Sequence, residues 1–215
     1  MKFLLICLVF FWISSTQAQQ SFAFSVAQPI EKSNVSAVEA NYYGIYQSDS
    51  IDTFYEFNEH GVWAISTIYS SISRETIRES TKYAVRNGYL FGVVENDSVP
   101  CFLEGEKYHF GIKHKEIIIG SKSKHEMKKM NNTTYIINFF EHGTFTPSEF
   151  VFNGKTLVVR HFDYENSTEL FKDIKIQNSI YDNNLKIITL TPTSKEWNKI
   201  EKSGLFGKKY IFIKN

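Results

Sequence analysis

Cysteine is scarce in this sequence, and its scarcity limits the chemistry that the chain can carry. Of the two cysteines, Cys7 lies in an N-terminal apolar run that we expect to be removed. The remaining Cys101 cannot form an intramolecular disulfide or a zinc site of paired thiolates. It stands within the apolar stretch 99–103, so we expect a buried and inert thiol.

Motifs of the common enzyme classes are also absent. The sequence contains no phosphate-binding glycine loop, no nucleophile elbow and no Asp-rich calcium loop. We therefore predict a non-enzymatic protein with no catalytic residue, no cofactor and no metal site. His161 and Asp163 fall on one face of a predicted strand, but no nucleophile signature accompanies them, so we interpret them as a surface pair.

Two further histidines lie in matching turns. His60 and His142 each precede a glycine, at positions where a polar residue that tolerates positive φ is favoured. A metal site shared with Glu59 and Glu141 would need both turns at the same end of the fold. We favour the simpler interpretation, in which both histidines are solvent-exposed turn residues.

An excess of charge of one sign is missing as well. The sequence holds 24 Lys and Arg residues against 23 Asp and Glu residues. Lys2 is the only charged residue among the first 18, so a chain cut there carries 23 residues of each sign. A neutral chain has no global attraction to polyanions, so we predict no nucleic-acid partner. We interpret the lysines within 122–129 as part of an ordinary solvated loop.

The longest apolar run is N-terminal and short. It covers 3–13, follows the basic Lys2, and precedes a small, polar stretch ending at Ala18. Such a run is too short to span a bilayer as a helix but fits a signal peptide. We predict a signal peptide at 1–18 cleaved after Ala18, no transmembrane segment, and a secreted or periplasmic protein. In a eukaryotic host the N-x-S/T sequons would be glycan candidates; they begin at Asn34, Asn96, Asn131, Asn132 and Asn166.

Aromatic residues beside turn residues are abundant. Residues 57–63 read F-N-E-H-G-V-W, and residues 139–145 read F-F-E-H-G-T-F. Each is followed by an Asn-Gly pair between apolar residues, at 83–90 and 150–157, which is the strongest short-range hairpin signal. The pattern predicts an all-β domain of antiparallel hairpins.

The likeness of the two halves has two explanations. A duplication would relate 41–120 to 133–215, with 121–132 as a linker. Hairpin chemistry alone would also produce it. We expect the domain to begin at Asn41, after an N-terminal tether at 19–40.

Local patterns predict several boundaries. Residues 107–113 alternate as a half-buried strand, and His114-Lys115 is interpreted as a turn into a return strand. Residues 70–81 are polar and keep no single period. Thr193 and Glu196 have the form of a capping box, which predicts one short helix before the closing strand 209–213.

The stretch Gly44-Ile45-Tyr46, the run of hairpins and the late helix resemble the lipocalin-like, or calycin, proteins of small exported bacterial type. The likeness covers most of 41–215. It implies an antiparallel up-and-down barrel whose interior could hold a small apolar ligand. A β-sandwich is the alternative architecture.

Two functions follow from these patterns. The first is an exported, non-enzymatic binding protein that holds a small hydrophobic or amphipathic ligand in a barrel. The second is an interaction or adhesion module that binds protein or glycan through its surface. Aromatic residues near the first hairpin are our candidate ligand-binding residues: Tyr43, Tyr46, Tyr55, Trp63 and Tyr69.

Overall fold

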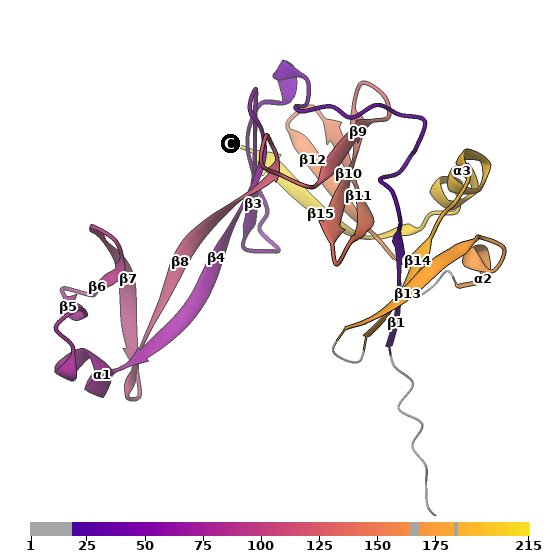
Figure 1. Ribbon diagram of the computed structural model, residues 1–215. Coiled ribbons are helices and arrows are strands. Elements are labelled where there is room, and N and C mark those ends of the chain that lie inside the picture. The colour runs from indigo at the N-terminus through magenta and orange to yellow at the C-terminus, as the bar shows by residue number, and fades with distance from the viewer. Residues whose placement is uncertain (1–18, 164–167, 183–184) are drawn as a thin grey trace, which may run out of the picture.

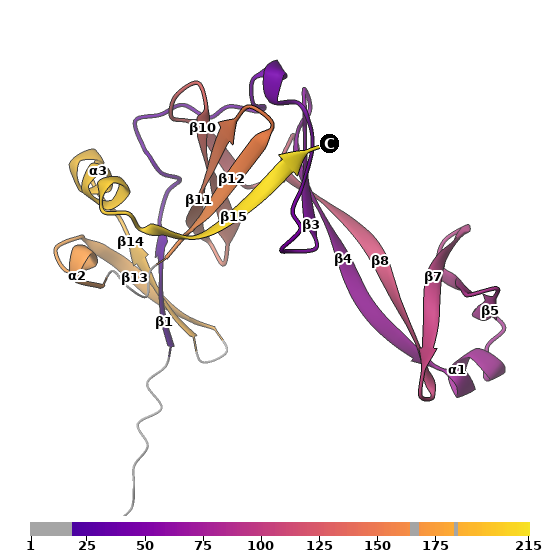
Figure 2. The same ribbon diagram turned by 180° about the vertical axis from the view of Figure 1, so that it is seen from behind.

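The computed structural model describes residues 19–163, 168–182 and 185–215, which form a body and a projecting arm (Figure 1). The predicted signal peptide 1–18 and the sequon residue Asn166 lie outside these ranges. We define the arm as residues 67–113 and the body as the other described residues. The view from behind shows the same division (Figure 2). No helix in the described ranges is long and apolar enough to cross a membrane.

The body is built on one antiparallel run of strands with the order β11-β12-β15-β2-β3-β4-β8, and β10 and β9 extend it from β11. The bounds of these strands, in chain order, are β2 (Gly44–Gln47), β3 (Thr53–Asn58), β4 (Gly61–Ser73), β8 (Lys107–Ile119), β9 (Glu126–Lys129), β10 (Thr134–Glu141), β11 (Thr144–Asn153), β12 (Thr156–Phe162) and β15 (Phe206–Lys214). Aromatic residues at alternate positions, such as Tyr55 and Phe57 on β3, fix the face that is buried.

A second group of elements packs beside this run. It comprises β1 (Gln19–Phe24), the short 3-10 helix η1 (Ala40–Tyr42), α2 (Thr168–Phe171), β13 (Ile176–Asp182), β14 (Leu185–Leu190) and α3 (Ser194–Lys202). β1 pairs in parallel with β14 along its whole length and touches β11 where Phe24 lies opposite Phe145. β1 therefore links the β13–β14 hairpin to the main run.

Two hydrophobic clusters hold the body together. In the first, the rings of Tyr46, Phe57 and Phe152 contact one another with centroids 5.1 to 5.6 Å apart, at the edge-to-face angles that aromatic pairs prefer. In the second, Trp197 packs edge-on against Phe24 at 5.5 Å. Large, fully buried rings of this kind dominate the free energy that stabilises a core.

The arm consists of the outer parts of β4 and β8 together with four short elements. These are α1 (Arg74–Glu79), β5 (Ala84–Arg86), β6 (Tyr89–Val94) and β7 (Asp97–Glu104). β3 pairs with β4 only as far as Ser66, whereas β8 accompanies β4 to Ser73. The two strands therefore leave the body as a ribbon, and β7, β6 and β5 continue the sheet at its far end.

The all-β prediction is confirmed, and so are the hairpins on which it rested. Both Glu-His-Gly stretches form tight turns, β3–β4 and β10–β11. The turns differ in phase: Gly61 pairs with Asn58, whereas Gly143 lies inside its turn next to His142. The C-terminal helix is also confirmed, with the predicted capping box formed by Thr193 and Glu196.

Closure into a barrel is not observed. Among the described residues, the strand order ends at β13 on one side and β5 on the other, and these strands do not pair with each other. The parallel pairing of β1 with β14 is a second departure from the predicted antiparallel up-and-down arrangement. In an up-and-down meander, each strand pairs with the strands next to it in sequence. The predicted arrangement therefore did not include this long-range pair.

Three local predictions are corrected. The expected tether 19–40 contains β1, whose Phe24 is fully buried. The expected linker 121–132 contains β9, whose Met127 is buried in the first cluster. No turn occurs at His114-Lys115, because β8 runs unbroken from Lys107 to Ile119. The polar residues at this point are compatible with a continuous strand, because this part of β8 is exposed to solvent.

Candidate functional site

The arm has a small core of its own, which fixes its two faces. Leu90, Val99 and Phe110 are buried together there. The antiparallel register places Tyr69 opposite Gly111, and Ser71 opposite His109. Because side chains alternate along a strand, Tyr69, Ser71 and His109 share the face opposite to that of Phe110.

β7 completes this face. Phe102 lies opposite His109 across the β7–β8 pair, and the two rings stack with centroids 5.5 Å apart and planes 21° from parallel. Phe102 is 63% exposed and Tyr69 is 74% exposed. The arm therefore presents large aromatic surfaces to solvent, although the packing of its own core does not require these rings to be exposed.

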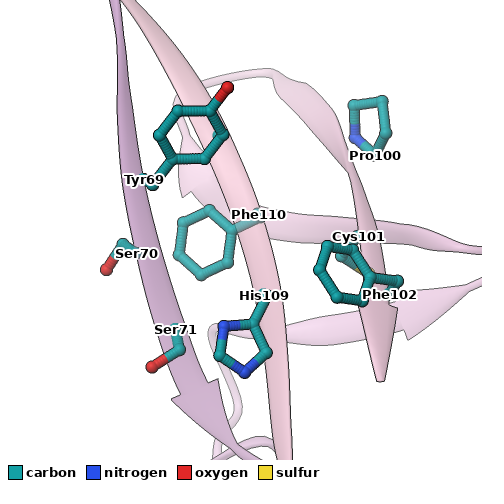
Figure 3. Close-up of a pocket in the computed structure, with 9 residues that line it drawn as sticks. Tyr69, Ser70, Ser71, Pro100, Cys101, Phe102, His109 and Phe110 are labelled. Carbon is teal, nitrogen blue, oxygen red and sulfur yellow. The ribbon is translucent and has the colours of Figure 1, made fainter. Parts of the chain in front are cut away.

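These side chains border a groove of about 550 Å³ (Figure 3). Three strands line it, β4, β7 and β8, and the lining residues are Tyr69, Ser70, Ser71, Pro100, Cys101, Phe102, His109, Phe110 and Gly111. The groove begins where β7 leaves β8, since Pro100 pairs with Tyr89 of β6 and not with β8.

Gly111 makes room for two neighbouring side chains at one end of the groove. A Cβ atom at Gly111 would lie 2.6 Å from Cγ2 of Thr67 and 3.4 Å from Cε1 of Tyr69. Thr67 and Tyr69 therefore lean across the position that a side chain at 111 would fill. A cross-strand aromatic that covers a strand glycine is a known way to hold such a pair in register.

Tyr69 also ties the arm to the body. Its hydroxyl donates a hydrogen bond of 2.6 Å to Oδ2 of Asp52, in the loop before β3. This hydrogen bond, together with the negative charge of Asp52, raises the pKa of the Tyr69 hydroxyl. The Tyr69 side chain thus links the arm to the loop before β3.

The groove offers little reaction chemistry. Burial raises the pKa of the Cys101 thiol, which disfavours the reactive thiolate. His109 is the only lining side chain with a basic nitrogen, and no carboxylate lies among the lining residues. What the arrangement can do is bury an apolar side chain between aromatic rings, next to a few hydroxyl and imidazole hydrogen-bonding groups.

The five predicted ligand-binding residues do not come together. Tyr46 and Tyr55 are buried in the first cluster, where burial raises the pKa of Tyr55 to about 12, and Tyr43 packs against that cluster. Trp63 lies on the body sheet with Nζ of Lys115 5.1 Å from the centre of its ring. Only Tyr69 lines the groove.

Sequence reasoning missed Phe102 and His109. They meet only through the β7–β8 register, which pairs residues across the Gly105 turn. The signal was present in the alternation of 107–113, which placed His109 on the solvent face. A matching alternation in β7 would have placed Phe102 on the same face.

The histidine alternatives do not form a metal site. In the described part of the chain, no group of three His, Cys, Asp or Glu side chains lies close enough to share a metal ion.

His161 belongs to the packing of the body. A hydrogen bond of 2.9 Å joins its Nδ1 to Oγ of the buried Ser148, and its ring meets that of Tyr210 edge-on. Burial, with the charge of Lys208, lowers the pKa of His161. This pair is part of the body's packing, because Ser148 is only 2% exposed.

No family model, no curated protein and no solved structure matches this chain. The lipocalin-like resemblance therefore stays a prediction, and function has to be argued from the geometry of the molecule.

Proposed function

We propose that this chain is an exported, non-enzymatic binding protein that holds apolar side chains of a protein partner in the arm groove. The observation that carries the proposal is the pair of exposed rings, Tyr69 and Phe102, beside an apolar groove on an element that projects from the body. Exposed aromatic residues of this kind commonly carry the binding energy of protein interfaces.

A protein partner fits the groove better than a glycan does. Sugar hydroxyls are usually held by carboxylate or amide side chains, which accept and donate several hydrogen bonds in one plane. Among the lining residues there is no Asp, Glu, Asn or Gln. The polar side-chain groups on the face of Tyr69 and Phe102 are the hydroxyl of Ser71 and the ring of His109. Such a lining suits an apolar side chain with one or two polar contacts.

A ligand inside a closed barrel is supported less well. The first cluster is filled with packed rings: Tyr55 contacts Phe150, and Tyr46 contacts Phe57. A small apolar ligand would have to displace these rings, at the cost of the contacts that hold the body together. The surface-binding alternative requires no such rearrangement.

Export is part of the proposal and rests on the sequence. The basic Lys2, the apolar run 3–13 and the small residues before Gln19 together form the signal peptide that we predict. An exported protein with a binding arm would meet its partner in the periplasm or outside the cell.

A selection from random peptides displayed on phage tests the groove directly. Peptides enriched on the wild-type protein should carry aromatic or large aliphatic residues. Phe102→Ser should weaken their binding about tenfold or more, as expected for an interface anchor. Leu103→Ser is the matched control, since Leu103 is the next residue and is 45% exposed but faces the other way. Selected peptides that bind Phe102→Ser as well as wild type would refute the groove.

A further inference from the structure

The outer edge of β4 is open along the arm. β3 covers this edge up to the pair Thr53–Ser66, and from Thr67 to Ser73 no strand in the described ranges pairs with it. Figures 1 and 2 show this part of the ribbon standing clear of the body. An uncovered edge presents backbone donors and acceptors that can template a further strand.

The direction of these backbone groups follows from the ladder. At the end of the β4–β8 pair, the Arg74 N–H donates a 2.9 Å hydrogen bond to the Glu106 carbonyl. In an antiparallel ladder such pairs recur at every second residue, so Ser70 and Ile72 also direct their groups at β8. The N–H and C=O groups of Tyr69 and Ser71 therefore point outward, into solvent.

The two edges of the arm are protected to different degrees. Beyond Phe110, the second edge of β8 carries the charged Lys113 and, where the arm meets the body, the charged Lys115, and charged residues discourage strand pairing. The β4 edge, 67–73, reads T-I-Y-S-S-I-S and contains no charge and no proline. An uncharged stretch rich in β-branched and aromatic residues is the kind that pairs with another chain.

The edge is complementary to itself. If two copies pair antiparallel about Ser70, Tyr69 lies opposite Ser71 of the second copy, and both residues direct their backbone groups at each other. Ile68, which is 53% exposed, lies opposite Ile72 of the second copy. The small Ser70 side chains meet at the two-fold axis, where a non-hydrogen-bonded pair brings the strands closest. No like charges come together.

We propose that a second copy of this chain covers the edge, so that β4 of each copy pairs antiparallel about Ser70 and joins the two arms into one continuous sheet. The antiparallel pairing places the two bodies at opposite ends of the joined arms. It also brings both grooves to the same face of the joined sheet. This inference does not rest on the proposed function, because it uses the outward backbone groups of β4, although the same strand also contributes Tyr69, Ser70 and Ser71 to the groove lining.

Sedimentation equilibrium of the purified protein over a range of concentrations provides the test. We expect wild type to form a dimer, and Ser70→Lys to weaken it about tenfold or more, because two lysines then face each other at the axis. Leu103→Lys adds the same charge at an exposed site on β7 and should dimerise like wild type. A wild-type protein that stays monomeric overturns the proposal, and so does a Ser70→Lys protein that dimerises with unchanged affinity.

Hydrogen exchange gives a second readout that does not depend on a variant. In wild type, the Tyr69 and Ser71 amides should become more protected as concentration rises, whereas the Ser70 amide, bonded to β8, should not change. Concentration-independent exchange at Tyr69 and Ser71 would contradict pairing through this edge even if a dimer forms.

Discussion

The body and the arm are both made of antiparallel strands, yet they bury their side chains in opposite ways. In the body, rings such as Phe57 and Phe152 are about 1% exposed and contact several other rings. In the arm, the buried cluster is small, and Tyr69 and Phe102 stay mostly in solvent. The body thus uses its aromatic residues for stability, while the arm leaves its own available for contact with another molecule.

The largest expected effect comes from removing a ring from each region. Phe152→Ala should lower the free energy of unfolding by about 3–5 kcal/mol, because Phe152 contacts the rings of Tyr42, Tyr46, Phe57 and Tyr135. Phe102→Ala should change it by less than about 0.5 kcal/mol, because its ring is exposed. Urea unfolding of both variants measures the contrast, and equal losses would remove the distinction between the two regions.

The second effect concerns the point where the ribbon is anchored in the body. Gly61 has φ of +137°, and a Cβ there would lie 1.8 Å from the Ile119 carbonyl oxygen. Gly61→Ala should therefore destabilise the protein by about 3 kcal/mol or more, since backbone must move. Gly143→Ala, in the matching turn, has φ of +80° and no atom within 4 Å, so about 1 kcal/mol is expected. Similar losses in thermal unfolding would show that the ribbon is not anchored by this close contact.

A smaller effect should be confined to the arm. Leu90 is fully buried in the arm cluster, so Leu90→Ala should cost about 2–3 kcal/mol of local stability. Hydrogen exchange should accelerate in β5, β6 and β7 but not in β10 or β12, because the arm can open while the body stays folded. Equal acceleration in both regions would mean that the arm and the body unfold as one unit.

The smallest effect is a pH dependence confined to the body. Burial lowers the pKa of His161 below its ordinary value of 6.5, so the unfolded chain binds this proton more readily than the folded protein does. The free energy of unfolding should therefore fall as pH drops below 6.5. Comparing urea midpoints at pH 7 and pH 5 checks this, and His161→Gln should have a flatter profile than wild type. An unchanged slope in that variant would exclude His161 as the source.

The parts of the fold that the sequence predicted are those fixed by short-range chemistry. Asn87 and Gly88 both have positive φ, as the two-residue hairpin turn requires. The capping box of Thr193 and Glu196 likewise involves only a few neighbouring residues. Long-range pairing was missed, because nothing near β1 indicates β14 as its partner. The arm was not predicted, because its strands carry polar residues on their exposed faces, and such residues are also typical of turns.

The candidate site was predictable only in part, for the same reason. Tyr69 was expected among aromatic residues near the first hairpin, and it does line the groove. Its neighbours Phe102 and His109 belong to a later hairpin and reach it only because β8 runs straight past His114. The other predicted residues are aromatic and close in sequence, but alternation along the strands sends Tyr46 and Tyr55 to the opposite, buried face.

The measurement that tests the account most directly is an NMR titration of the isotope-labelled protein with a phage-selected peptide, followed through its backbone amide shifts. We predict that the largest changes fall on the strands that line the groove, at Tyr69, Ser71, Phe102, His109 and Gly111, with the body almost unaffected. Shifts concentrated around Tyr46 and Tyr55, inside the body, would contradict a binding role for the arm and favour an interior ligand.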